Sequence, residues 1–447
     1  MSESYTEKVK KLGEEVTKYR KYGLSDNPFP SKAIFTDWAP NIAEILETFC
    51  WEIRKEEILE IHDKLIEEAY YNQKSTNVWL QGEVGVGKSS VLIYMWKQLQ
   101  TYRSDVVALY SELGSGFPYV YERVISQLGL DFFRDLVFKL AAAVVLKNPE
   151  LFSLKKDDPI IEELKKDASS IREYLGEVET EESDEEEKGK IDINQVANVL
   201  QSELNQLGVT TKLRDCLVKM LKDSYAGYNE LFTKIASTQR RKALGELFRV
   251  FKFAGYRMSY LFLDQLDFMW RNVFKKAQQD RIVQELRQFA NETLGYVSIA
   301  TTTYPDLTPL FESQYPHLKA ALPITKRKIV DIKPLDAQEA RIMTTKYLEK
   351  VKTSESIPGL YPFTEQAIDF ICEYRGGLPR DMLVDLHDIL DEAVEQCVKI
   401  IDVDFVKKFY EVQEEGEKRP VPSKGSAEEK VKRPRMEVKF EDITKVE

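Results

Sequence analysis

The chain has 447 residues, of which 64 are Lys or Arg and 75 are Asp or Glu, and its formal net charge is −11. Apolar residues make up 43% and aromatic residues 11%, which excludes a wholly disordered chain, and the length predicts two or three domains with cores of their own. The acidic balance, taken alone, argues against a basic protein that coats nucleic acid.

Other classes of protein are excluded by segments and residue types. The longest apolar run, Leu140–Leu146, is far shorter than the ~18–20 residues that span a bilayer, and residues 2–7 show no secretory signal, so no membrane partner is expected. The four cysteines are scattered, which favours buried thiols and a cytoplasmic location. The three histidines are isolated, which disfavours a histidine metal site or a Ser-His-Asp triad.

Residues 1–75 are predicted to form an N-terminal helical segment. Asn27–Pro30 is expected to be a turn, because each proline disfavours helix just before it. Apolar residues then recur at helical spacing up to Asn72, at Ile58, Ile61, Leu65 and Ala69.

The next segment predicts a βαβ unit. A short apolar strand at 77–80 leads into a glycine-rich turn, a helix marked by apolar residues from 91 to 99, and a second strand at 106–110. This order implies a parallel sheet covered by helices, and therefore an α/β fold.

A long helical insertion is expected at about 130–240, because this stretch shows helical periodicity and no convincing strand. It contains Glu177–Glu187, in which eight of eleven residues are acidic, and such a segment is expected to be a solvated loop. This loop supplies most of the net charge, so the acidity of the whole chain does not exclude nucleic acid as a partner.

Further strands are predicted at 260–263, 296–300 and 329–332, followed by helices that begin near Asp336, Thr364 and Pro379. Asp336 and Glu339 have the spacing of a capping box. The resulting division is an α/β core at 76–325, a helical lid at 326–412 and a disordered tail at 413–447.

The strongest motif is Gly82–Ser89, in which two glycines four residues apart precede Lys and Ser between a predicted strand and a predicted helix. Its glycines allow backbone N–H groups to point at phosphates, Lys88 is expected to reach the β- and γ-phosphates, and Ser89 to bind Mg²⁺. A plain glycine turn is the alternative. The residues expected around ATP·Mg²⁺ are Gly82, Glu83, Val84, Gly85, Val86, Gly87, Lys88, Ser89 and Ser90.

A second acidic group is expected to hold the magnesium, and the strand at 260–263 ends in Asp264. An ordinary surface aspartate after a buried strand is the alternative interpretation.

With these features in this order, the chain resembles the AAA+ ATPases, and more closely the initiator-type (origin-recognition-like) clade and related signal-transducing P-loop ATPases. The resemblance spans roughly residues 20–410. It rests on Gly82–Ser89, on Leu247–Tyr256 leading into the Asp264 strand, on Thr301–Thr303 after a strand, and on Gly377–Arg380 opening a helix.

The resemblance implies roles for further residues, each with an alternative. Thr301 or Thr302 would be the sensor-1 group beside the γ-phosphate, unless the threonines form only a turn. Arg380 would be sensor 2, gripping phosphate from the lid, unless it is a surface arginine. Arg327 is a candidate for the finger that touches a neighbour's nucleotide, or part of a basic patch, and Arg54 is a candidate for the adenine end.

One departure from the family concerns catalysis. The family follows the Walker-B aspartate with a glutamate that deprotonates the attacking water, and here Gln265 stands there. An amide holds water but does not take its proton, so ATP binding with slow hydrolysis is predicted, with Asp267 as a possible substitute.

Two functions remain open. The first is a nucleotide-dependent switch in DNA transactions, which would contact DNA through the insertion, residues 239–242 or the tail cluster at 430–435. The second is a protein–protein switch without direct nucleic-acid binding, whose insertion or acidic loop presents a surface to a partner. The family also implies homo-oligomers.

Overall fold

The protein is described by a computed structural model over residues 18–31, 50–176, 191–266, 275–305, 307–353 and 359–418. Its centre is a five-stranded sheet in which all pairs are parallel and the strand order is β2–β5–β6–β1–β7. These strands are β1 (Asn77–Gln81), β2 (Val106–Glu112), β5 (Met258–Asp264), β6 (Val297–Thr303) and β7 (Ile329–Asp331). The predicted α/β class, with a long helical insertion and a helical C-terminal region, is confirmed.

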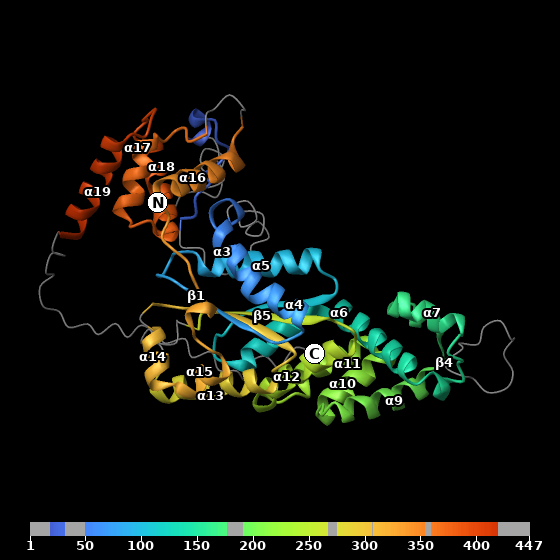
Figure 1. The fold of residues 1–447 in the computed structure, drawn as a ribbon. Coiled ribbons are helices and arrows are strands. Elements are labelled where there is room, and N and C mark those ends of the chain that lie inside the picture. Colours follow the sequence, from blue (N-terminus) through green and yellow to red (C-terminus); the bar gives the residue numbers. More distant parts are fainter. Residues whose placement is uncertain are drawn as a thin grey trace, which may run out of the picture.

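Helices cover both faces of the sheet (Figure 1). Successive side chains of a strand point to opposite faces, so Leu80, Tyr110 and Phe262 pack in one hydrophobic cluster while Leu109 and Leu261 pack in another. The first face carries α3 (Lys55–Ile61), the π-helix η2 (His62–Glu67), α4 (Glu68–Asn72) and α5 (Lys88–Tyr102). The second carries α6 (Phe117–Lys147), α12 (Ser237–Phe253) and α13 (Lys276–Glu292).

The insertion between β2 and β5 is continuous with the second face. Helix α6 covers the sheet and then runs on into the insertion past Gly129, whose φ of 72° interrupts the helical path. The other elements are η3 (Pro149–Phe152), α7 (Pro159–Lys166), η4 (Ala168–Ser170), α8 (Ile171–Tyr174), β3 (Leu175–Gly176), β4 (Ile191–Asp192), α9 (Ile193–Gln206), α10 (Thr211–Lys222) and α11 (Ser224–Thr233). The expectation of no strand here was wrong, because β3 pairs with β4 on either side of the acidic loop. The loop itself, residues 177–187, lies outside the described residues.

The C-terminal helices begin where capping side chains predicted them. Asp336 and Glu339 form the expected capping box, and Thr364 accepts a hydrogen bond from the N–H of Ala367. The elements after β6 are α14 (Leu307–Gln314), α15 (Pro316–Ala321), η6 (Lys326–Lys328), β7, α16 (Ala337–Val351), α17 (Glu365–Tyr374), α18 (Pro379–Glu395) and α19 (Val403–Lys418).

Two boundaries differ from the predicted division. Because β7 pairs with β1, a boundary at residue 326 divides the sheet, and a division after Asp331 keeps it whole. Helix α19 continues past residue 413 to Lys418, so the predicted tail is helical at its start. The cluster at 430–435 lies outside the described residues.

We call the helices α16–α19 the lid and residues 18–31, which include η1 (Lys18–Tyr22), the N-terminal strap. Across the described ranges, no helix is both long and apolar enough to cross a membrane.

Candidate nucleotide-binding site

The glycine-rich loop lies at the carboxyl end of β1 and leads directly into α5, which begins at Lys88. Gly85 and Gly87 have φ angles of 83° and 102°, a region that side-chain-bearing residues rarely adopt. A Cβ on Gly82 would lie 2.5 Å from the carbonyl oxygen of Ile332, whereas a Cβ on Gly87 would meet nothing within 4 Å. The glycines therefore serve backbone shape and close approach, and the loop is open at Gly87, as a phosphate cradle requires.

Lys88 is buried beside this loop. Its Nζ donates to the carbonyl oxygens of Gly82, at 2.7 Å, and Glu83, at 2.9 Å, and lies 4.7 Å from the ring centroid of Tyr304. Phosphate oxygens are stronger acceptors for an ammonium than neutral carbonyls are, so an anion at this position would draw Nζ to itself. Ser89 and Ser90 are half-buried in the first turn of α5, where backbone N–H groups lack helical partners.

Arg54 holds the backbone of the glycine-rich loop through a side-chain hydrogen bond. Its side chain is only 2% exposed, its Nη2 donates to the carbonyl oxygen of Val86 at 3.1 Å, and its Nη1 pairs with Glu57 at 3.3 Å. Sequence reasoning suggested Arg54 for the adenine end, and the structure places its guanidinium on the backbone of the glycine-rich loop.

Asp264 ends β5, which is separated from β1 by β6, and is 1% exposed. One carboxylate oxygen accepts from the Tyr110 hydroxyl at 2.9 Å, and the other accepts from Thr302 Oγ1 at 3.2 Å and from the Gln265 N–H at 2.7 Å. Burial, followed by the Asp264 charge, raises the pKa of Tyr110 well above its usual value, so the phenol stays a neutral donor. A hard carboxylate fixed at this edge is the kind of ligand that Mg²⁺ takes.

The register of β6 distinguishes the threonines. Thr301–Thr303 belong to the strand, so the alternative of a turn was wrong. Thr301 pairs with Leu263, which places Thr302 on the same face as Asp264 and Thr301 on the opposite face. Within the described residues, the buried Thr301 hydroxyl has no hydrogen-bond partner.

The lid reaches the glycine-rich loop through the first turn of α18. The backbone N–H of Arg380 donates to the carbonyl oxygen of Gly85 at 3.3 Å, and a Cβ on Gly85 would lie 3.2 Å from the Cβ of Arg380. Arg375 and Tyr410 both bond to Asp385, which fixes α18 within the lid. The loop, Asp264, Thr302 and Arg380 thus converge on one edge of the sheet.

Other predicted residues lie elsewhere. Arg327 is exposed on η6, before the first residue of β7 and therefore at the opposite edge from the loop, while its neighbour Lys328 contacts Glu68 and Thr76. Gln265 has a φ of 58° directly after β5. Asp267 lies outside the described residues.

The basic segment 239–242 is largely neutralised. Arg240 pairs with Glu122, and Arg241 makes two hydrogen bonds to Glu292, at 2.6 and 3.1 Å. These arginines are therefore engaged by carboxylates rather than displayed for phosphates.

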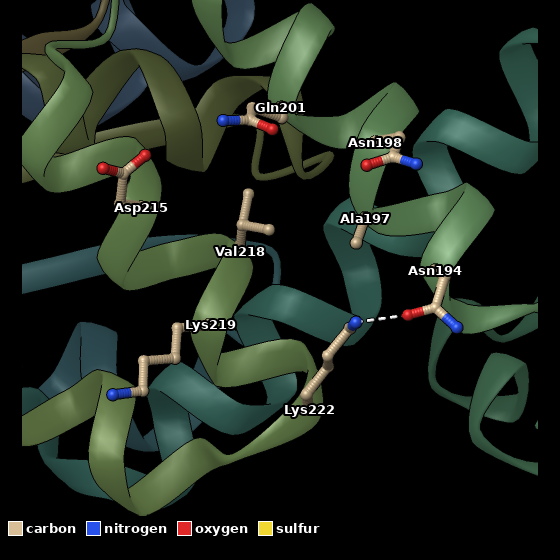
Figure 2. A pocket seen from close by; sticks show the side chains of 8 residues that line it. All are labelled: Asn194, Ala197, Asn198, Gln201, Asp215, Val218, Lys219 and Lys222. Carbon is tan, nitrogen blue, oxygen red and sulfur yellow. Dashed lines mark hydrogen bonds between the residues drawn. The ribbon is translucent and has the colours of Figure 1, made fainter. Parts of the chain in front are cut away.

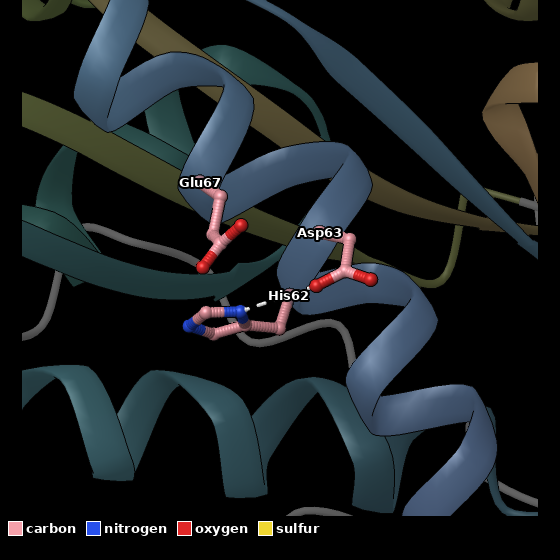
Figure 3. Close-up of side chains that lie close together, drawn as sticks. All are labelled: His62, Asp63 and Glu67. Atoms are coloured by element: carbon pink, nitrogen blue, oxygen red, sulfur yellow. Dashed lines mark ion pairs between the residues drawn. The ribbon is translucent and has the colours of Figure 1, made fainter.

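Two groups lie away from the loop. A pocket of 390 Å³ between α9 and α10 is lined mostly by polar side chains, and Lys222 donates to Asn194 across it (Figure 2). His62, Asp63 and Glu67 lie together on η2, with potential ligand atoms within 4.8 Å of one another, but all three are exposed (Figure 3). Exposed acidic groups of this kind commonly occur without an ion, and we assign no metal to them.

Sequence reasoning missed Tyr110 and Glu112. Both lie on β2, and Glu112 pairs in register with Asp264. The signal that could have found Tyr110 and Glu112 is the matching ends of the two apolar strands at 106–112 and 258–264. If these strands are paired end to end, both residues lie beside Asp264.

This arrangement is an α/β fold with a parallel sheet, a glycine loop at the carboxyl end of β1 and a helical C-terminal region, which is the fold class that the resemblance to the AAA+ proteins implied. No family profile and no curated protein matches the chain. Among solved structures, it is similar to the Orc1 protein of Aeropyrum pernix in complex with DNA, at 13% identity and a TM-score of 0.39 over 81% of this chain and 65% of that one. It is also similar to Drosophila ORC bound to DNA, at 14% identity and a TM-score of 0.35 over 91% of this chain and 73% of that one. The chain thus spans slightly less than two thirds of the length of the Orc1 chain.

Proposed function

We propose that the chain binds ATP·Mg²⁺ at the glycine loop and acts as a nucleotide-dependent switch with slow hydrolysis. The observation that carries the proposal is the convergence of the loop, Lys88, the Asp264–Thr302 pair and the lid residue Arg380 at one edge of the sheet. Lys88 and the first-turn N–H groups of α5 would hold the phosphates, while Ser89 and Asp264 would hold the magnesium. When bound, Mg²⁺ neutralises charge on the phosphates.

A switch follows from the contact between the lid and the loop. Because the Arg380 N–H donates to a loop carbonyl, a change in loop conformation on nucleotide binding bears directly on α18. The lid packs in the same hydrophobic cluster as α5, so its position depends on that helix.

The test is ATP binding by the wild type, Lys88→Ala and a control, Lys97→Ala, which alters a lysine on the same helix away from the loop. A labelled ATP analogue with Mg²⁺ should bind Lys88→Ala at least about tenfold more weakly, which is about 1.4 kcal/mol, and Lys97→Ala as tightly as the wild type. Equal binding by all three proteins contradicts the proposed site.

Slow hydrolysis is proposed because Gln265 follows Asp264. We expect a turnover below about 1 s⁻¹, the lower end of typical enzymes. A vigorous steady-state rate that Lys88→Ala abolishes contradicts the slow switch.

Association with DNA transactions is the biological role we propose, on the motif resemblance to initiator-type ATPases. The pairing of Arg240 and Arg241 with acidic side chains favours the second candidate, a protein–protein switch that uses the helical insertion. Binding to duplex DNA, with and without ATP at two salt concentrations, separates the two. Phosphate-mediated binding falls steeply with salt, and no binding at low salt in either nucleotide state leaves the protein–protein switch. In either role, Arg327 is exposed at the edge of the sheet opposite the glycine-rich loop. It would therefore contact the nucleotide of a second copy of the chain rather than the nucleotide bound to the same chain.

A further inference from the structure

Glu112 is a carboxylate at the same edge of the sheet as Asp264. It is the last residue of β2 and pairs in register with Asp264, so both side chains point to the face covered by α5. Tyr110, two residues earlier on the same face, reaches Asp264 with its hydroxyl. The three residues form one row at the carboxyl ends of β2 and β5.

The end of β2 is held in place. The N–H of Leu113 donates to the backbone oxygen of Asp264 at 3.0 Å, and the chain then turns through Gly114 and Gly116, both with positive φ. Glu112 therefore has a fixed backbone position, as a group that acts on a bound water requires.

The Glu112 carboxylate takes no part in the interactions that hold the described fold together. It is half-buried, and in the part of the chain that the structure describes it makes neither a hydrogen bond nor an ion pair. Its charge contributes, after burial and Asp264, to the raised pKa of Tyr110, while Arg123 on α6 acts in the opposite direction. The charged groups that act on the Tyr110 hydroxyl are thus Asp264, Glu112 and Arg123.

The neighbouring groups are poor proton acceptors. Asp264 already accepts from Tyr110, Thr302 and the Gln265 N–H, and a bound metal would hold it further. Gln265 has no basic atom at neutral pH.

We infer that Glu112 is the general base for ATP hydrolysis, a role that rests on the proposed ATP site. In this step the water oxygen forms a bond to the γ-phosphorus, and the bond from that phosphorus to the β–γ bridging oxygen breaks. The water proton passes to the Glu112 carboxylate, and the products are ADP and inorganic phosphate. Glu112 lies one strand further from β1 than Asp264 does.

The test uses the full chain with Glu112→Gln, the double variant Glu112→Gln/Gln265→Glu, and Asp331→Asn as the matched control. Asp331 is a carboxylate at the carboxyl end of β7 on the other side of the loop. Hydrolysis is followed with γ-labelled ATP and protein in excess, and affinity is measured separately with a labelled non-hydrolysable ATP analogue and Mg²⁺.

We expect Glu112→Gln to bind the analogue within about threefold of the wild type and to hydrolyse ATP about 10²–10⁴-fold more slowly. Asp331→Asn should hydrolyse normally, and the double variant should recover activity, because its carboxylate stands directly after Asp264.

A second readout does not depend on turnover. Glu112→Ala should bind Mg·ADP·aluminium fluoride, a mimic of the reacting state, more weakly than the wild type while binding the ATP analogue equally. Wild-type hydrolysis by Glu112→Gln, or no hydrolysis by a wild type that binds ATP, overturns Glu112 as base and leaves the ATP site standing. Failure of the wild type to bind ATP overturns the proposed function itself.

Discussion

Asp264 is a buried carboxylate, and the cost of burying it is offset by the hydrogen bonds that it accepts. The Tyr110 hydroxyl is one of these, and it belongs to a strand that the chain leaves long before it reaches Asp264. A buried oxygen left without its donor costs about 1–3 kcal/mol.

We therefore predict that Tyr110→Phe lowers the free energy of unfolding by about 1–3 kcal/mol in the absence of nucleotide. ATP·Mg²⁺ should reduce this difference, because a metal ion at Asp264 replaces the lost donor. Urea unfolding with and without ATP·Mg²⁺ measures both effects. Tyr347→Phe is the control, because Tyr347 is buried in the same cluster but its hydroxyl makes no hydrogen bond within the described residues. Equal losses in the two variants contradict the prediction.

Arg54 links the helical segment before β1 to the glycine-rich loop. We predict that Arg54→Leu weakens the binding of ATP and of inorganic tripolyphosphate alike, each by about tenfold, because the variant removes a support from the loop rather than a contact to the base. Competition against a labelled ATP analogue measures both affinities. A loss confined to ATP would instead place Arg54 at the adenine.

At the scale of elements, the sequence predicted what is local. The loop at Gly82–Ser89 and the carboxylate of Asp264 could be proposed from the sequence because their patterns lie within single strand–loop units. The choice between Thr301 and Thr302 could not be made from the sequence, because it depends on the register of β6 against β5. Glu112 was missed for the same reason, since β2 and β5 are neighbours in the sheet but are separated in sequence by the whole insertion.

The turn between α17 and α18 positions Arg380 against the loop. It contains two glycines with similar φ, 59° at Gly376 and 71° at Gly377, but different surroundings. A Cβ on Gly377 would lie 2.2 Å from the carbonyl oxygen of Leu335, whereas a Cβ on Gly376 would meet nothing within 4 Å.

These surroundings make the two glycines a matched pair. We predict that Gly376→Ala lowers the free energy of unfolding by about 1–2 kcal/mol, the cost of the left-handed conformation, and that Gly377→Ala loses about 1–3 kcal/mol more. Only Gly377→Ala should also weaken ATP binding, because it must shift the start of α18. Urea unfolding and analogue binding test the pair, and equal effects in both assays contradict the role given to this turn.

For the whole molecule, the sheet separates two hydrophobic clusters. The insertion shares one with α6 and α12, while the lid, α5 and the N-terminal strap share the other. The candidate site is thus built by residues on the lid's side of the sheet. The strap ties onto the lid at Asp391, which accepts from the Tyr19 hydroxyl and, at 2.9 Å, from the Asn27 side chain.

The Asp391 contacts predict how the strap responds to pH. Partial burial works against the charged carboxylate, but hydrogen bonds from Tyr19 and Asn27 and the charge of Lys18 hold the pKa of Asp391 below its usual value. Burial and the bond to Asp391 raise the pKa of Tyr19 to about 12, so Tyr19 remains a donor at neutral pH. Because the folded-state pKa of Asp391 is lowered, its contribution is present above the unfolded value of about 3.9 and is lost as the pH falls through the folded value.

We expect Asp391→Asn to lower the free energy of unfolding by about 1–2 kcal/mol at pH 7, and the difference from wild type to shrink steadily between about pH 5 and pH 3. The control is Glu395→Gln, which neutralises an exposed carboxylate on the same helix and should change little at any pH. Urea unfolding across this range gives the difference directly, and limited proteolysis at pH 7 should cut the strap faster in Asp391→Asn. A difference that stays constant down to pH 3 would mean that the charge of Asp391 does not hold the strap on the lid.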